Sequence, residues 1–404
     1  MEKLKYLPVV FFLFSILLSI QRGQDPFLFD EDLGEGFVVL RTEGEYTIEE
    51  GRLLSKVKVL GGDFPEIYGR RAIFIVYSAL DLPSRNLKAY AKVKVSKGRV
   101  FITSSYRDLS FTESKPSFRE RMIKRVEEKF EDRQVKSLVL AYFLGEDQEL
   151  LPLKVQSAFL TTGLVHLLVV SGGHLTALAL ILRYLAPYRY GLLLSLVGIT
   201  FYSLFLVPSE PPVLRAYLMA VFVILLLLYG ERPNLLNILF LSGAIILLFY
   251  PEYVYSYSFW LSFCATLYII LSLRDAPKKG LVFMFFWVSF FAFLGTMPII
   301  TLLSFSAPFS VILTPLLTPL FSLFTVYGFL DMVTLFSLPS FPLELLGTAI
   351  IKTVVFFSDF APTVFFKFRL WETVLSLLLG AFTLYFLKGW NKLFAGVVFV
   401  PFLF

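Results

Sequence analysis

Long apolar runs dominate the sequence from residue 138 to its end, and short polar stretches separate them. Most of these runs approach the roughly 20 residues that a helix needs to cross the hydrocarbon core of a bilayer. We therefore predict a polytopic α-helical membrane domain over residues 161–404, with about 8–10 spans. The predicted spans lie near residues 162–186, 190–207, 212–229, 234–250, 254–273, 281–302, 311–337, 344–360 and 371–387.

A shorter apolar run occupies residues 6–20. It is short for a full span, and no clear small-residue cleavage site follows it. We interpret residues 1–20 as a membrane anchor, with the core of a signal peptide as the alternative. In both cases the run carries the next segment across the membrane and leaves Lys3 and Lys5 on the cytoplasmic side.

Between residues 21 and 112 the pattern changes to short alternating or β-branched runs separated by turn residues such as Gly61-Gly62. Five such strands in about 70 residues are typical of a small closed β-barrel, including the oligonucleotide/oligosaccharide-binding (OB) type. We therefore predict an OB-like β domain here. The predicted strands are residues 37–42, 53–60, 72–77, 87–95 and 100–104.

Residues 113–160 are predicted to form an amphipathic helical connector. Within residues 117–136, Phe118, Met122 and Val126 recur at helical spacing among charged neighbours. Such a helix packs either on the protein or on the membrane surface. A second amphipathic segment follows at residues 153–159.

The composition supports the same division. The chain is 57% hydrophobic and 17% charged with a mean hydropathy of +0.73, whereas ordinary soluble domains carry about 25% charged residues. Residues 138–404 contain 24 Asp, Glu, Lys or Arg in 267 positions, and residues 21–137 contain 41 in 117 positions. A soluble globular protein is excluded, and a charged N-terminal domain followed by a membrane domain is expected.

Cysteine and histidine are too scarce for several kinds of chemistry. A single cysteine, Cys264, excludes a disulfide within the chain and a thiolate-cage metal site. Two histidines, His166 and His174, are too few for the dinuclear sites of metallohydrolases. We predict neither a metal nor a cofactor.

Loop charges give the orientation of the predicted spans. Up to residue 305, cations occupy every other loop, as the positive-inside rule requires, and after it Lys367 and Arg369 break the alternation. This alternation makes the first span run inward, so residues 21–137 lie outside the cytoplasm, in agreement with the N-terminus. The loop cations are Arg183, Arg189, Arg232, Arg274, Lys278 and Lys279.

The candidate pathway residues begin in the first span, at His166, Ser171, Gly172, Gly173 and His174. Polar groups inside an apolar span usually face a bundle interior or a water cavity. On an unbroken helix the two imidazoles share one face about 12 Å apart, too far to ligate one ion, although the two glycines can break the helix there. We favour a polar pathway or helix-clamp role over plain interhelical hydrogen bonds. A hydrolase that uses Ser171 with His174 lacks a carboxylate in the same span.

Two further residues in later spans are candidates for the pathway. Arg215 lies one turn inside the outer edge of an apolar run and either presents a positive charge to an entering anion or snorkels outward. Ser262 forms a polar notch in an aromatic span, which is most often a packing feature.

The β domain offers a candidate nucleic-acid surface. On one predicted strand, alternate basic side chains with an aromatic among them fall on the same face. Such a face can track a polyanion, and a solvated sheet face is the alternative. The candidate DNA-binding residues are Lys88, Tyr90, Lys92, Lys94, Lys97 and Arg99.

Four ordered segments resemble those of the ComEC competence-protein family. They read FLGE at residues 143–146 with GLVHLLVVSGGH at 163–174, LRAYLM at 214–219, residues 237–251, and SFWLSFCA at 258–265. The family usually has Leu where this chain has Gly173, and Gly and Gln where it has Ser258 and Trp260.

The resemblance implies a channel in the bacterial inner (cytoplasmic) membrane that takes up single-stranded DNA during natural transformation. It implies an extracytoplasmic OB-type domain and a competence domain. Longer members add a metallo-β-lactamase-like nuclease, but no histidine follows His174, so this chain is expected not to be an enzyme. The implied partners are single-stranded DNA, the lipid bilayer, a separate nuclease, a DNA receptor, a cytoplasmic ATP-driven motor and further copies of the chain. Rival hypotheses are transport of another anionic polymer or a small solute on the same fold, and the serine hydrolase.

Overall fold

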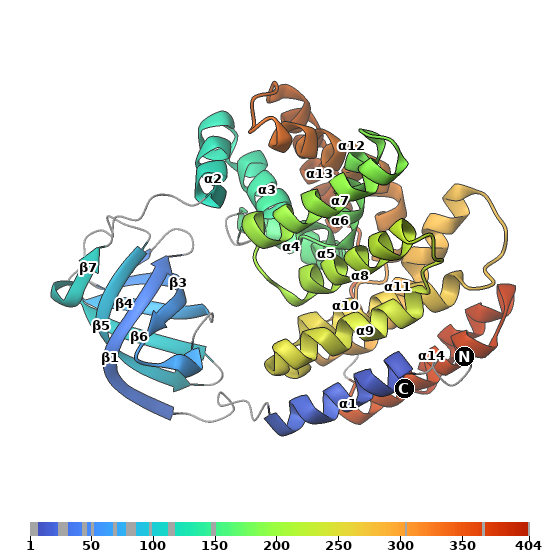
Figure 1. Cartoon of the computed structure of the whole chain (residues 1–404), viewed down its shortest axis with the longest axis horizontal. Coiled ribbons are helices and arrows are strands. Elements are labelled where there is room, and N and C mark those ends of the chain that lie inside the picture. Colours follow the sequence, from blue (N-terminus) through green and yellow to red (C-terminus); the bar gives the residue numbers. More distant parts are fainter. Residues whose placement is uncertain are drawn as a thin grey trace. The chain divides into compact units, whose positions relative to one another are not determined.

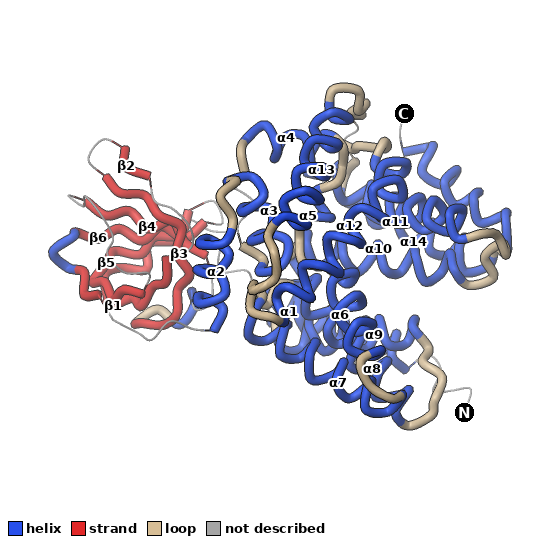
Figure 2. The backbone as a smooth tube through the Cα atoms, turned by 90° about the horizontal axis from the view of Figure 1, so that it is seen from above, coloured by secondary structure: helices blue, strands red, loops and turns tan. Residues whose placement is uncertain are grey.

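The computed structural model divides the chain into two compact units, Gly23–Ser117 and a helical unit of Met1–Arg22 with Phe118–Phe404 (Figure 1). Figure 2 shows the strands in the first unit and most of the helices in the second. The described residues are 7–22, 31–42, 47–49, 52–67, 71–77, 86–96, 99–111, 118–146, 151–303, 305–365 and 368–402. The N-terminal Lys3 and Lys5 and the candidate Lys97 lie outside them.

The first unit is a β-sheet, and its five long strands contain the five predicted segments. These strands are β1 (Glu31–Thr42), β3 (Arg52–Gly62), β4 (Arg71–Tyr77), β5 (Asn86–Ser96) and β6 (Arg99–Ser105). The shorter elements are β2 (Thr47–Glu49), β7 (Leu109–Phe111) and the turns η2 (Pro65–Ile67) and η3 (Tyr106–Asp108). A sheet at this place in the chain is confirmed, and the closed OB-type barrel stays a prediction.

The strands pair in the order β1-β3-β4-β6-β5-β7, and β1 also pairs with β5. All these pairings are antiparallel except the one between β4 and β6. Strand β1 is long and pairs with two neighbours. It pairs with β5 from Glu31 to Arg41 and with β3 from Val38 to Thr42. Alternate side chains such as Val38, Leu40, Val57 and Phe74 are fully buried and form the core of this unit.

The described elements of the second unit are all helical, apart from one isolated bridge between Ser306 and Val364. Its helices before residue 172 are α1 (Leu7–Arg22), α2 (Phe118–Lys129), α3 (Arg133–Leu144), α4 (Leu153–Thr161) and α5 (Val165–Leu168). The later elements are α6 (Gly172–Tyr184), α7 (Tyr188–Phe201), η5 (Tyr202–Leu206), α8 (Pro211–Leu228), α9 (Leu235–Phe249), η6 (Pro251–Tyr255), α10 (Tyr257–Leu273), α11 (Leu281–Leu303), α12 (Ser310–Val333), α13 (Phe341–Ser358), α14 (Leu370–Phe386) and η7 (Gly389–Phe402).

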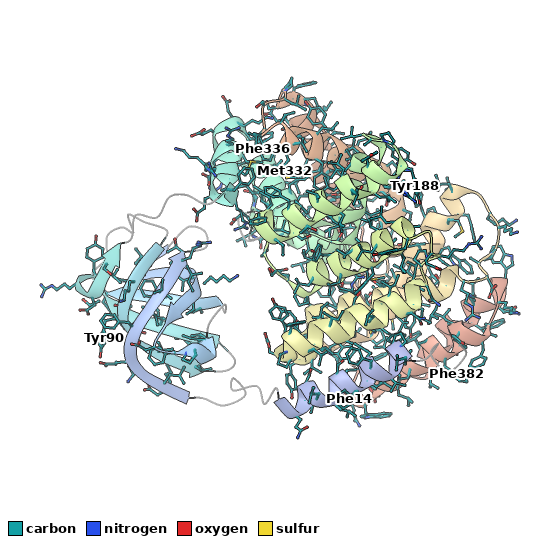
Figure 3. All side chains as sticks on the ribbon, viewed as in Figure 1. Phe14, Tyr90, Tyr188, Met332, Phe336 and Phe382 are labelled. Atoms are coloured by element: carbon teal, nitrogen blue, oxygen red, sulfur yellow. The ribbon has the colours of Figure 1, made fainter. Side chains whose placement is uncertain are left out.

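Five helices among the described residues are long and apolar enough to cross a membrane, and they fit a helical membrane protein. They are Tyr188–Leu206, Pro211–Leu228, Leu281–Leu303, Ser310–Val333 and Phe341–Ser358. Helices α1, α9, α10 and α14 are apolar but shorter. Large apolar side chains such as Phe14 on α1 and Phe382 on α14 project from the unit, as expected for surfaces that face lipid (Figure 3).

The first predicted span is wrong as a single helix. Residues 162–186 contain the end of one turn, the four-residue helix α5, an extended stretch and then α6. Val169 and Ser171 have extended backbone, so the break falls directly before Gly172-Gly173 rather than within them. The two histidines therefore belong to different helices, and the predicted i, i+8 relation does not apply.

Helix α1 packs into the helical unit. The Phe12 ring is 3% exposed and stacks on Phe263 of α10 with ring centroids 4.6 Å apart. The Ser19 hydroxyl donates to the Leu247 carbonyl of α9 at 2.9 Å. A Cβ on Gly243 would approach a Phe12 ring atom to 2.7 Å, so the glycine lets α1 come close to α9. Apolar and polar contacts thus join α1 to two later helices.

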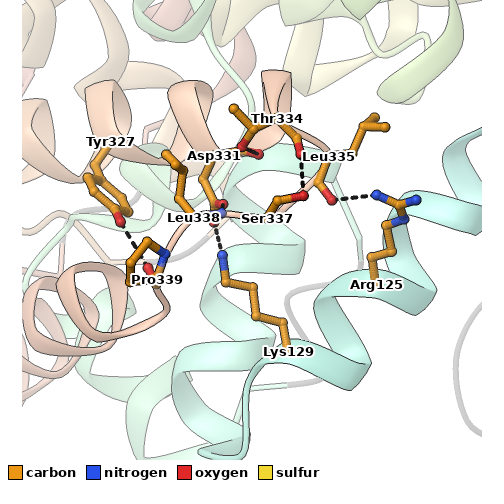
Figure 4. A network of polar contacts seen from close by, with 9 residues as sticks. All are labelled: Arg125, Lys129, Tyr327, Asp331, Thr334, Leu335, Ser337, Leu338 and Pro339. Atoms are coloured by element: carbon orange, nitrogen blue, oxygen red, sulfur yellow. Dashed lines mark hydrogen bonds and ion pairs between the residues drawn. The ribbon is translucent and has the colours of Figure 1, made fainter.

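Helix α2 rests on protein. Its apolar residues Met122, Ile123 and Val126 are buried in the largest core cluster. On the same helix, the Lys129 ammonium pairs with the fully buried Asp331 carboxylate near the end of α12, and Arg125 donates to the Leu335 carbonyl at 2.8 Å (Figure 4). Of the two predicted surfaces for this amphipathic helix, the protein surface is the one observed.

Candidate functional site

The start of α6 is held by a capping box in which a histidine takes the usual place of Glu or Gln. The Ser171 backbone N–H donates to His174 Nδ1 at 3.1 Å, and the Gly173 N–H donates to Ser171 Oγ at 3.3 Å. Because Nδ1 accepts this hydrogen bond, the neutral imidazole carries its proton on Nε2. The side chains of Ser171 and His174 therefore fix the residue at which α6 begins.

The His174 ring of α6 packs among aromatic side chains of α3 and α12. It is 3% exposed, and its centroid is 4.1 Å from that of Tyr142 and 6.4 Å from that of Phe329. Its Nε2 atom is buried without a hydrogen-bond partner among the described residues. The Tyr142 hydroxyl is 2.6 Å from the Thr325 hydroxyl oxygen, which fixes the ring against His174. His174 thus clamps the start of α6 to two neighbouring helices.

His166 lies apart from these aromatic side chains. It is exposed on the short helix α5, and its Nδ1 is 2.9 Å from the Gly163 carbonyl of the preceding turn. Gly163 has a φ of 73°, and a Cβ there would approach the Ala307 carbonyl oxygen to 3.1 Å. The glycine is required by this turn, and His166 contacts its backbone rather than His174.

Arg215 on α8 is a buried cation, 9% exposed. Its Nε donates to Ser262 Oγ of α10 at 2.7 Å, and its Nη1 lies 3.4 Å from the Met219 sulfur. Within the part of the chain that the structure describes, no carboxylate pairs with it. The two acceptors of the guanidinium, Ser262 and Met219, are neutral and leave its buried charge uncompensated, which is unfavourable away from water.

The guanidinium faces the first turn of α6. A Cβ built on Gly172 would lie 3.8 Å from Arg215 Nη2 and 3.6 Å from Ala216 Cβ. A Cβ on the next residue, Gly173, would meet only Ser171 Oγ within 4 Å, at 3.5 Å. The structure therefore brings Gly172, Arg215 and Ser262 together from α6, α8 and α10, while Gly173 is exposed on another side of the helix.

A second polar cluster was not foreseen from the sequence, although its acid lies in the FLGE segment. Arg119 of α2 pairs with Glu146 at 2.9 Å and donates to the carbonyls of Leu144 and Leu206, each at 2.9 Å. Gly145 ends α3 with a φ of 63°, and a Cβ there would approach Pro208 to 2.6 Å. This cluster joins α2 to the ends of α3 and η5, so we interpret it as a structural support.

On the sheet, the predicted basic face is present on β5 and includes an aromatic pair. Lys88, Tyr90, Lys92 and Lys94 are all exposed. Tyr90 faces Phe37 of β1 in register, with ring centroids 5.2 Å apart, and the two rings are 42% and 47% exposed. The Lys88 ammonium lies 4.6 Å from the Phe37 ring centroid. Phe37 was missed because only strand pairing brings it beside Tyr90.

One lysine of this face is partly neutralised. Lys92 pairs with Asp32 of β1 at 3.0 Å. The hydrogen bond from Lys92 lowers the pKa of the Asp32 carboxyl from its usual value, and the same bond raises the pKa of Lys92. Arg99 stands at the start of β6. The charge available to a polyanion is therefore concentrated at Lys88 and Lys94.

No group of three or more His, Cys, Asp or Glu side chains that could hold a metal ion occurs among the described residues. The single cysteine, Cys264, is buried and free.

Comparison with known proteins gives two findings. The model of the family described as Competence protein matches residues 143–392, a region that contains α6, α8 and α10. An uncharacterized protein of Aquifex aeolicus (strain VF5) is 39% identical over 385 residues, which cover 95% of this chain and 92% of that protein. No solved structure matches the chain.

Proposed function

This chain belongs to the competence protein family, and from that membership we propose that it serves DNA uptake as a membrane channel for a single DNA strand. The observation that carries the proposal is the buried guanidinium of Arg215. It lies inside the matched region, beside a broken helix, with no carboxylate among the described residues to compensate its charge. A passing polyanion would supply that compensation.

Three helices would form the part of the conduit around this cation. Ser262 holds the guanidinium by its Nε, which leaves its Nη2 edge directed to the first turn of α6. Ser171 and His174 would act as positioning residues because they fix where α6 begins. His166, exposed on α5, is a candidate for contact with the strand before it reaches Arg215.

The sheet unit would receive the strand. Its strand order, the double pairing of β1 and the parallel pairing of β4 with β6 favour an OB-type surface. Phe37 and Tyr90 offer two exposed rings for base stacking, and Lys88 and Lys94 offer charge for the backbone. Stacking of a base on an aromatic ring contributes about 1–3 kcal/mol, so this pair is enough to hold a strand transiently.

The proposal places the chain in the bacterial cytoplasmic membrane, with the sheet unit outside the cytoplasm. A separate nuclease would degrade the second strand, and a DNA receptor and a cytoplasmic ATP-driven motor would deliver and pull the first. Further copies of the chain are additional candidate partners.

We propose no catalytic step for this chain. A serine hydrolase would need a free base beside Ser171, but His174 Nδ1 already accepts the Ser171 N–H. It would also need an acid to orient the imidazole, and Nε2 meets no polar partner among the described residues.

The remaining rival is transport of another anion on the same fold. The test is uptake into liposomes that contain the purified chain, with fluorescent single-stranded DNA, double-stranded DNA and inorganic polyphosphate as cargo. We expect nuclease-protected single strands only in liposomes with the protein. Uptake of polyphosphate in preference to DNA would support the rival, and equal protection in empty liposomes would refute both.

A further inference from the structure

Gly172 leaves the space of one Cβ between the first turn of α6 and the guanidinium of Arg215. Because Cα–Cβ bonds tilt toward the N-terminus of a helix, a Gly172 Cβ would point to the N-terminal end of α6 and meet atoms of α8 there. One of these atoms is Arg215 Nη2, 3.8 Å from the Cβ position. A side chain here would take the place in front of the guanidinium.

Both sides of this space carry donors without acceptors among the described residues. Arg215 uses Nε for Ser262 and Nη1 for Met219, and its Nη2 donates to no described group. The Gly172 N–H, the first of α6, also donates to no described group, whereas the next two backbone N–H groups are bonded to Ser171. The unpaired first N–H groups of a helix favour an anion.

We infer that Arg215 Nη2 and the Gly172 N–H at the start of α6 form a binding site for one phosphodiester group. A phosphodiester carries one negative charge and two unesterified oxygens, which match one guanidinium edge and one N–H donor. This inference rests on the proposed function where the phosphodiester belongs to a DNA strand. A phospholipid headgroup also contains a phosphodiester and is the second source of this group.

Salt dependence of DNA binding measures the number of phosphates that a protein neutralises. Log affinity falls linearly as log salt rises, and each phosphate contact on a single strand adds about 0.7 to the magnitude of this slope, which is called the slope below. The measurement uses the full chain in a maltoside detergent, which contains no phosphate, with fluorescent oligothymidylate. Arg215→Gln is expected to lower the slope by about 0.7, and Arg215→Lys is expected to restore it.

A pair of glycine variants tests the site without changing charge. Gly172→Ala adds a methyl group at ordinary contact distances of 3.6 and 3.8 Å, so the chain can fold while the space is filled. Gly173→Ala is the matched control because its methyl group points toward Ser171 Oγ instead. We expect Gly172→Ala to lower the slope as Arg215→Gln does, and Gly173→Ala to keep the wild-type slope.

The amount of phospholipid that copurifies with each variant separates the two sources. A lower slope with unchanged phospholipid content assigns the phosphodiester to the strand. An unchanged slope with a lower phospholipid content in Arg215→Gln and Gly172→Ala assigns it to a lipid headgroup. Equal slopes and equal phospholipid content in all variants would overturn the site. Failure of wild-type liposomes to take up DNA while the slopes still differ would refute the proposed function alone.

Discussion

Replacement of His174 distinguishes a structural clamp from a group that acts on the cargo. His174→Ala leaves the Ser171 N–H without its acceptor and removes the ring that packs 4.1 Å from the Tyr142 centroid. Loss of a helix cap costs about 0.5–2 kcal/mol, and loss of an aromatic contact costs about 0.5–1.5 kcal/mol. The two together predict a free energy of unfolding lower by about 1–3.5 kcal/mol.

His174→Gln is the informative partner of that variant. Glutamine at the third position of a helix is a standard member of the capping box, so it can accept the Ser171 N–H while the aromatic contact is lost. The expected loss of stability is therefore about 0.5–1.5 kcal/mol, smaller than for His174→Ala.

Thermal unfolding of the purified variants in detergent measures these differences, at about 2–4 °C per kcal/mol. Liposome uptake of single-stranded DNA is measured in parallel. We expect His174→Gln to melt above His174→Ala and to keep most of the uptake. If the glutamine variant melts as low as the alanine variant, the capping argument is wrong. If it is stable but inactive, the imidazole acts on the cargo instead of clamping α6.

Three further predictions follow from contacts elsewhere in the chain. Phe37→Ala and Tyr90→Ala should each weaken single-strand binding by about 1–3 kcal/mol, measured by the fluorescence anisotropy of a labelled strand. The control is Tyr77→Ala, which removes an exposed ring on β4 and should leave the binding free energy unchanged. Equal losses in all three variants would refute the stacking pair. Asp331→Asn should lower the free energy of unfolding of the helical unit by about 3–5 kcal/mol because it breaks the buried ion pair with Lys129. Lys124→Gln removes an exposed ion pair and should change the same free energy by less than about 1 kcal/mol. Similar melting temperatures of the two variants would contradict this. Helix α1 packs on α9 and α10 and should therefore remain attached to the mature protein. The mass of the intact protein should include this helix. A mass that shows cleavage after α1 would favour the signal-peptide interpretation.

Local pattern predicted much of the fold because each element carries its own periodicity. Alternating apolar residues located the five long strands, and apolar runs located helices from α7 to α14 within a few residues. The first predicted span failed for a local reason that the pattern does not record. Apolar residues continue through Val169 and Val170, but the Ser171–His174 capping box starts a new helix there.

The candidate site was only partly predictable because its members are distant in sequence. Arg215 and Ser262 were each recognisable as polar groups in apolar runs, but only the packing of α8 on α10 makes them a hydrogen-bonded pair. Tyr142, which packs on His174, has no polar signal of its own. Phe37 likewise becomes a partner of Tyr90 only through the register of β1 with β5.

The central claim is that one strand threads through this chain, and a strand blocked at one end tests it most directly. The strand carries a fluorescent label at its leading end and streptavidin at its trailing end, and the liposomes contain a single-strand nuclease. Both polarities are measured. We predict that, for at least one polarity, the internal nuclease releases the leading label while the streptavidin stays accessible to antibody outside. A leading label that remains uncut in both polarities, in liposomes whose protein is folded and correctly oriented, would contradict the account.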